Sequence, residues 1–133
     1  MAFTISTGKT EATGTFSLIN NIYTLTSISG TADNTNTTLG TVPANKKWTI
    51  INANFSAVNG AGSIKYITIS ANGNTIAAGE IYSGVGTGKE NVSKSWIYGQ
   101  APVITAGQTI VLNNTNGAGY PAVAQIDYIE ETV

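Results

Sequence analysis

Short β-branched runs make up most of this chain, and Gly, Asn, Thr and Ser interrupt them at close intervals. No long stretch repeats with the period of a helix. Regular short strands with turn signals between them are typical of a β-sandwich or barrel. We therefore expect an all-β fold with strands at about 37–42, 47–57, 63–71, 75–83, 92–99, 108–114 and 121–131.

Two local features refine this expectation. Asn72-Gly73 separates two alternating runs, and it is the strongest hairpin signal because both residues tolerate positive φ. In the strand at 47–57, the apolar positions change parity between Ile50 and Ile51. This change predicts a β-bulge or a bend in that strand.

The N-terminal part differs in character from the rest. Residues 15–19 and 22–28 are strand-like, and Asn20-Asn21 between them is a two-residue hairpin signal. We predict an N-terminal arm and β-hairpin over 1–36 and a β-sandwich over 37–133, together forming one compact unit. A hairpin alone is barely stable, so it must dock on the body or on a neighbouring subunit.

Composition excludes several classes of function. The 133 residues suit one domain, and they include no Cys, which excludes disulfides and thiolate zinc sites. Charged residues are 10% of the chain, against about 25% in typical proteins. Six scattered Lys without Arg make a poor nucleic-acid surface. There is no apolar run long enough for a membrane span, and residues 1–6 lack the features of a signal peptide.

We expect no catalytic residue, no metal site and no cofactor. General acid–base catalysis most often uses His, which is absent. Glu130 and Glu131 are adjacent on a strand, so they point to opposite faces and cannot act as a catalytic pair. The oxygen-rich segment at 33–36 lacks the Gly and the distant Glu of an EF-hand loop. The low-charge surface suits a protein that is packed against others, because free proteins normally rely on net charge for solubility.

The aromatic residues offer two interpretations. Tyr120, Trp96, Tyr98 and Tyr82 could form a surface that stacks sugars or contacts a partner, and Tyr120 is the best ligand candidate because it lies in a Gly-rich loop. The alternative is packing in the core and at subunit interfaces, where aromatic side chains bury large areas.

Glu80 and Lys94 suggest a structural pair. Each is the odd polar residue among apolar neighbours on one face of its predicted strand. If strands 75–83 and 92–99 pair antiparallel around Thr87, Glu80 lies opposite Lys94. The competing interpretation places the two strands in different sheets.

Two phrases resemble known proteins. The stretch from Leu39 to Ile50, LGTVPANKKWTI, resembles a recurring phrase of tailed-bacteriophage virion proteins, in which it opens a jelly-roll. The stretch from Ile104 to Leu112, ITAGQTIVL, resembles the same proteins and also the trimeric jelly-rolls of the C1q and tumour-necrosis-factor type. Where that pattern has Asp after the Gly, this chain has Gln108.

The resemblance implies a β-sandwich of jelly-roll type and a non-enzymatic virion structural protein. The expected role is capsid decoration or cementing, with homotrimer formation and a major capsid or tail protein as the partner. The alternative is a receptor-binding or carbohydrate-binding head of a tail fibre or bacterial adhesin, which would add host glycans to the partners. The expected location is the virion, after synthesis in the bacterial cytoplasm.

Overall fold

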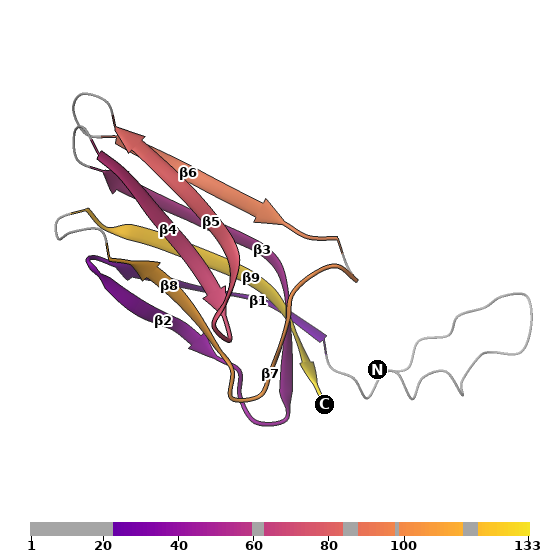
Figure 1. Ribbon diagram of the computed structural model, residues 1–133. Coiled ribbons are helices and arrows are strands. Elements are labelled where there is room, and N and C mark those ends of the chain that lie inside the picture. The colour runs from indigo at the N-terminus through magenta and orange to yellow at the C-terminus, as the bar shows by residue number, and fades with distance from the viewer. Residues whose placement is uncertain (1–22, 60–62, 84–87, 98, 116–119) are drawn as a thin grey trace, which may run out of the picture.

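The computed structural model describes residues 23–59, 63–83, 88–97, 99–115 and 120–133, and it is all-β over these ranges (Figure 1). The strands in the described part are β1 (Tyr23–Ala32), β2 (Thr35–Thr41), β3 (Lys46–Asn59), β4 (Ser63–Ala71), β5 (Asn74–Ser83), β6 (Gly88–Ser95), β7 (Val103–Thr105), β8 (Thr109–Asn114) and β9 (Ala122–Thr132). The all-β prediction is confirmed.

The strands form two antiparallel sheets that lie as two layers (Figure 1). Sheet A has the order β1-β9-β3-β6, with the short β7 also paired to β3. Sheet B has the order β2-β8-β4-β5. The chain passes between the layers after most strands, so neighbours within a sheet are usually distant in sequence.

The core lies between the inner faces of the two sheets. In β9, the alternate residues from Ala122 to Tyr128 are buried and those between them are more exposed. The largest side chains with under 2% exposure come from both sheets and from the β2–β3 connection, namely Ile50, Ile67, Ile69, Ile104, Ile110, Leu112, Ile126, Asn114 and, in the connection, Val42. Alternation along the strands therefore leaves each sheet with an outer face that points away from the core.

The predicted bulge in β3 is confirmed. The pairing of β3 with β9 shifts register between Ile50 and Asn52, so Ile51 is the extra residue. Its carbonyl accepts a hydrogen bond from the Trp96 backbone N–H at 3.1 Å. Because of the extra residue, Ile50 and Ala53 both face the core although they are three positions apart.

The predicted hairpin at Asn72-Gly73 is also confirmed. These two residues connect β4 to β5 and have φ values of 48° and 78°. A second two-residue turn, Asp33-Asn34, connects β1 to β2, with φ 51° at Asn34. Residues 33–36, the oxygen-rich segment, are therefore a turn and the start of β2. The turn signal at Asn20-Asn21 lies outside the described residues.

The division of the chain at residue 36 needs correction. Residues 23–32 form β1, which pairs with β9 along its whole length from Tyr23 opposite Glu131 to Ala32 opposite Ala122. The boundary between 36 and 37 falls inside β2. The arm prediction thus concerns at most residues 1–22, which the structure does not describe.

The predicted pairing of Glu80 with Lys94 is wrong. β5 pairs with β4 in sheet B, where Glu80 lies opposite Tyr66, whereas β6 pairs with β3 in sheet A, where Lys94 lies opposite Ala53. Alternating apolar positions fit either partner strand equally well, so they do not decide which strands pair. Lys94 still obtains a partner, because its Nζ donates to the backbone carbonyl of Ile76 in the other sheet at 3.0 Å.

Candidate interaction surface

The aromatic residues predicted as a ligand surface do not come together in the part of the chain that the structure describes. Trp96 is half-buried against the core, and the Lys94 Nζ lies 5.1 Å from its ring centroid. Tyr120 precedes β9, and its backbone N–H donates to Asp33 Oδ1 at 3.3 Å. The Trp96 backbone N–H bonds to Ile51 of β3, next to the position where β3 pairs with Tyr128 of β9. Tyr128 lies about six residues, or roughly 20 Å, along β9 from the end of the strand that Tyr120 precedes. Tyr98 and the side chain of Tyr82 lie outside the described residues.

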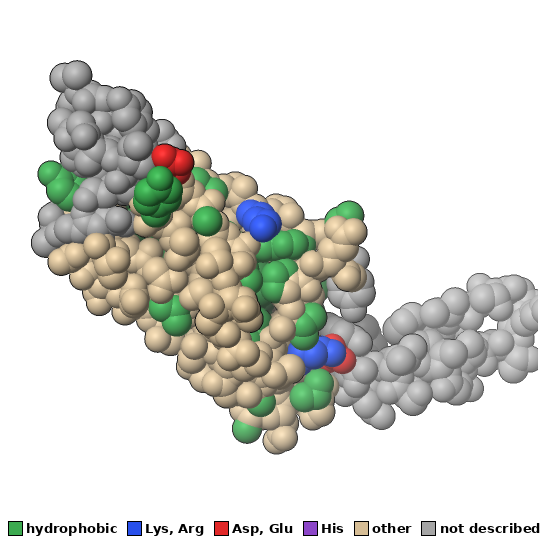
Figure 2. Space-filling view, in the orientation of Figure 1, with side chains coloured by type: hydrophobic (Ala, Val, Ile, Leu, Met, Phe, Trp, Pro, Cys, Tyr) green, Lys and Arg blue, Asp and Glu red, His purple; other side chains and the backbone are tan. Residues whose placement is uncertain are grey.

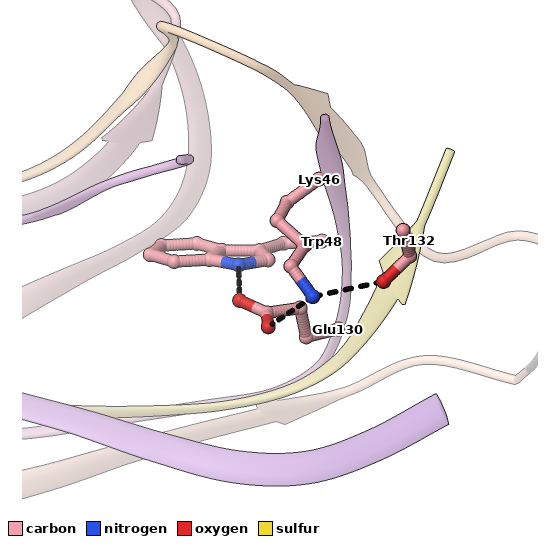
Figure 3. A network of polar contacts seen from close by, with 4 residues as sticks. All are labelled: Lys46, Trp48, Glu130 and Thr132. Carbon is pink, nitrogen blue, oxygen red and sulfur yellow. Dashed lines mark hydrogen bonds and ion pairs between the residues drawn. The ribbon is translucent and has the colours of Figure 1, made fainter. Parts of the chain in front are cut away.

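A polar cluster closes one end of sheet A (Figure 3). The Trp48 indole Nε1–H donates to Glu130 Oε2 at 2.8 Å, and Lys46 Nζ lies 3.3 Å from Glu130 Oε1. Lys46 Nζ also donates to Thr132 Oγ1 at 2.8 Å. We call Lys46, Trp48, Glu130 and Thr132 the rim cluster. The indole bond, followed by Lys46, lowers the pKa of the Glu130 carboxyl below its ordinary 4.5.

Trp48 joins this cluster to the core. Its ring lies 4.1 Å from that of Tyr128, centroid to centroid, at an interplanar angle of 30°. Across the sandwich, Gly40 of β2 approaches the same indole so closely that a Cβ there would lie 3.1 Å from Trp48 Cη2 and 2.9 Å from Ile28 Cδ1. Burial raises the pKa of the Tyr128 phenol above its ordinary value of 10.0. The rim cluster is therefore a structural element of the sandwich.

The two phrases that carry the family resemblance lie side by side. The Val42 N–H donates to the Gln108 carbonyl and the Gly107 N–H donates to the Val42 carbonyl, each at 2.9 Å. Gly107 has φ 81°, which favours glycine. The Gln108 side chain accepts a hydrogen bond from the Thr105 N–H at 2.9 Å, so it closes the turn in the position where the family pattern has Asp.

The outer face of sheet A carries a row of polar side chains that bond to one another. Ser27, Asp127, Asn52 and Ser95 lie opposite each other on β1, β9, β3 and β6. Ser27 Oγ donates to Asp127 Oδ1 at 2.6 Å, Asn52 Nδ2 donates to Asp127 Oδ2 at 3.0 Å, and Ser95 Oγ donates to Asn52 Oδ1 at 3.2 Å. We call these four residues the closed row.

Asp127 organises this row. The hydrogen bond from Ser27 and then that from Gln125 Nε2, which is 2.9 Å long, hold the pKa of the Asp127 carboxyl below its ordinary 3.8. Asn52 adds to the same effect. Three side-chain donors around one carboxylate stabilise its charged form.

The two adjacent rows differ from the closed row. One consists of Ser29, Gln125, Asn54 and Ser93, and the next of Thr31, Val123, Ser56 and Asn91, again across β1, β9, β3 and β6. We call these eight residues the open rows. Except for the Gln125 bond to Asp127, their side chains make no hydrogen bond within the described part of the chain. Most of them line a shallow hollow of about 490 Å³.

At the other end of the same face lies an apolar row. Leu25, Ile129, Thr49 and Val103 are opposite one another on β1, β9, β3 and β7. Leu25 is 68% exposed and Val103 is 54% exposed. Beside them, Lys47 Nζ and Glu131 Oε2 form an ion pair of 2.7 Å. The charges that border the apolar row therefore cancel each other.

The face of the molecule seen in Figure 2 contains little charge. Figure 2 shows one face of the molecule, in which uncharged polar side chains and backbone predominate among the described residues and charged groups are few and scattered. The described residues contain no group of three or more His, Cys, Asp or Glu that could hold a metal ion. A search of the same residues finds no helix of the length and apolarity that crossing a membrane requires.

A comparison with known protein families and with curated proteins finds no match for this chain. The assignment of a function therefore depends on the residues and their geometry.

The open rows were not predicted from the sequence, although a signal was present. Asn54-Phe55-Ser56 and Asn91-Val92-Ser93 are Asn-x-Ser triplets, in which the polar residues recur with the period of a strand. The antiparallel register of β3 and β6 places Asn54 opposite Ser93 and Ser56 opposite Asn91. The triplets thus form a small block of alternating amides and hydroxyls.

Proposed function

We propose that this chain is a non-enzymatic structural protein of a tailed-phage virion, built as a jelly-roll β-sandwich. The observation that carries the proposal is the strand order, β1-β9-β3-β6 in one sheet and β2-β8-β4-β5 in the other. Eight of the strands pair from the two ends of the chain inward, namely β1 with β9, β2 with β8, β3 with β6 and β4 with β5. Such pairs divided between two sheets are the pattern of jelly-rolls, which occur in capsid proteins and lectins. Fold analogy alone supports many functions, so the residues must support this one as well.

The contact between the two phrases adds to the resemblance. They are separated by more than fifty residues in the sequence, yet backbone hydrogen bonds join Val42 to Gly107 and Gln108. The phrases therefore act as one structural unit at the end of the sandwich.

The roles of the charged side chains favour a structural protein. Lys46, Glu130 and Trp48 form the rim cluster, and Lys47 pairs with Glu131. Asp127 is bonded to three neighbouring side chains. These groups stabilise the arrangement of β1, β3 and β9, and the hydrogen bonds that Asp127 and Glu130 accept lower the pKa values of both carboxyls.

We assign the contact between copies to the apolar row. Contiguous exposed apolar patches mark interaction surfaces, and Leu25, Ile129 and Val103 lie in one row across the sheet. At a symmetry axis the same side chains of each copy meet, so uncompensated charges would repel each other. Leu25 and Val103 beside the neutral Lys47–Glu131 pair meet this requirement. A homotrimer that decorates or cements a capsid is the assembly we propose.

The location can be tested by immunogold electron microscopy. Antibodies against the purified chain would be applied to intact phage particles purified from a lysate. Uniform labelling of heads is the result expected for a decoration protein. Labelling confined to the tail tip would replace decoration by a receptor-binding role, and unlabelled particles would exclude a virion protein.

The assembly is tested separately by light scattering of the purified chain. We expect three times the mass of one chain, and Leu25→Asp with Val103→Asp should reduce it to the mass of a monomer. The matched control is Thr38→Asp on the outer face of sheet B, which should leave the mass unchanged. A wild-type monomer at high concentration would contradict the assembly.

A further inference from the structure

We propose that the open rows on the outer face of sheet A form a binding site for a neutral carbohydrate. The residues that would make the contacts are Ser29, Gln125, Asn54, Ser93, Ser56 and Asn91, which line the hollow of about 490 Å³. This site is separate from the aromatic residues that the sequence indicates and from the apolar row. It does not depend on where in a virion the chain resides.

The chemistry of the lining selects the ligand class. An amide side chain offers both donors and an acceptor, and a hydroxyl offers one donor and two acceptor positions. Asn54 opposite Ser93, and Ser56 opposite Asn91, place these groups in an alternating block at the spacing of neighbouring strands, about 5 Å. Sugar hydroxyls are likewise both donors and acceptors at short spacing. A polyhydroxylated ligand can therefore satisfy several of these groups at once.

The hollow has both polar and apolar parts, as most small-molecule sites do. Its volume lies in the range of roughly 300–1,000 Å³ that is usual for ligand pockets, and Phe55, Val92, Val123 and Ala124 contribute apolar atoms to its lining. Here the exposed apolar side chain in the open rows is Val123, at 48% exposure, next to Ser56 in the register. An exposed aliphatic group beside hydroxyls and amides suits the C–H face of a sugar ring, while the polar groups meet the ring's hydroxyls.

Charge favours a neutral ligand over an ionic one. The side chains that line the hollow are uncharged, so an anion would find no cation among them. Among the described side chains, the carboxylate in the adjacent row is that of Asp127, and it already accepts bonds from Ser27, Asn52 and Gln125. A cation would have to displace these donors. A neutral oligosaccharide requires no such rearrangement.

The closed row also holds one side chain of the proposed site, Gln125, in a fixed position. Because Gln125 Nε2 donates to Asp127 Oδ1, the Gln125 side chain is held in place while its Oε1 has no partner among the described residues. Fixing a side chain before the ligand arrives reduces the entropy that binding must offset. Asp127 thus acts as a positioning residue for the carbohydrate site.

A protein partner fits the open rows less well. The central parts of protein interfaces are rich in aromatic residues, Met and Arg, whereas Ser is depleted there. The open rows contain none of the enriched types and three Ser residues. A second copy is better accommodated by the apolar row, at the opposite end of the same face.

The experiment uses the complete chain, produced in bacteria, labelled with a fluorophore and applied to an array of neutral and anionic glycans. We expect retention by a group of related neutral glycans. The strongest of these is then titrated into isotope-labelled protein and followed by NMR. Backbone amide shifts should concentrate at residues 54–56, 91–93 and 123–125. Retention by no neutral glycan, stronger binding of anionic glycans, or shifts confined to other residues would each overturn the proposal.

Substitutions test the same site. Asn54→Ala with Asn91→Ala should weaken binding by about tenfold or more, since each removes an amide that meets sugar hydroxyls. The matched control is Asn36→Ala, an exposed Asn on the outer face of sheet B, which should leave the affinity unchanged. Thermal unfolding of all three proteins shows whether the fold is intact. Equal affinities for the double variant and the control would contradict the assignment to the open rows.

Discussion

The closed row and the adjacent open row cross the same four strands of sheet A, and both present short hydroxyl and amide side chains to solvent. They differ mainly at β9, where the closed row has Asp127 and the open row has Gln125. The carboxylate draws Ser27, Asn52 and Gln125 into hydrogen bonds, whereas the amide leaves Ser29, Asn54 and Ser93 without partners among the described residues. One ionised group therefore converts a polar surface from a potential binding surface into a structural network.

The rim cluster extends this comparison into the sandwich. Glu130 also collects donors, from Trp48 and Lys46, but its main donor is attached to a buried ring. Hydrogen bonds that include a charged group are stronger than neutral ones, and their loss costs more when the group is less exposed. The cost of removing a contact should thus decrease from the rim cluster to the closed row and then to the open rows.

The largest expected effect is at Trp48. Trp48→Ala should lower the free energy of unfolding by about 3–5 kcal/mol, because it removes a buried ring as well as a donor. Trp48→Phe retains most of the packing and should cost about 1–2 kcal/mol, through the donor that Glu130 loses. Chemical denaturation of both variants measures these values. If the two variants were equally destabilised, the hydrogen bond would matter more than the packing.

Asp127→Ala should have a smaller effect, about 1 kcal/mol, because the closed row is partly exposed to solvent. The control is Gln125→Ala, which removes one bond and leaves the other two donors of Asp127 in place. Urea denaturation should rank Asp127→Ala as the less stable of the two. Equal stability would show that the closed row contributes no more than the open one.

Acid should weaken the closed row and the rim cluster together. The folded pKa values of Asp127 and Glu130 lie below their ordinary 3.8 and 4.5, so the folded state binds these protons less readily than the unfolded state. The resulting stabilisation is complete above the ordinary values and is lost as the pH falls through the lowered ones. Thermal midpoints should decline below about pH 4.5, and less steeply in Asp127→Asn with Glu130→Gln. A parallel decline in the variant would assign the acid sensitivity to other carboxylates.

The smallest expected effect on stability is at the open rows. Asn54→Ala or Ser93→Ala should change the free energy of unfolding by less than about 0.5 kcal/mol, as is usual at surface positions without structural contacts. Differential scanning calorimetry is sensitive enough to compare them with Asp127→Ala. A loss as large as that of Asp127→Ala would mean that the open rows have a structural role after all.

Local patterns were sufficient for the elements and for some of their details. The period of two predicted most strands, Asn72-Gly73 predicted the β4–β5 hairpin, and the change of parity at Ile50 and Ile51 predicted the bulge. β7, with only three residues, was missed because so short a strand has no detectable period. These successes share a cause, since backbone preference and alternation depend on neighbours in the sequence.

Only the tertiary structure decided which strands lie beside each other. Glu80 and Lys94 have the pattern of a cross-strand pair, yet their strands belong to different sheets. The closed row combines Ser27, Asn52, Ser95 and Asp127, which come from four distant parts of the chain. Alternation along a strand can indicate only that such a residue faces outward. Which outward-facing residues meet depends on non-local pairing, where many registers satisfy the same alternation and burial of the whole core selects one.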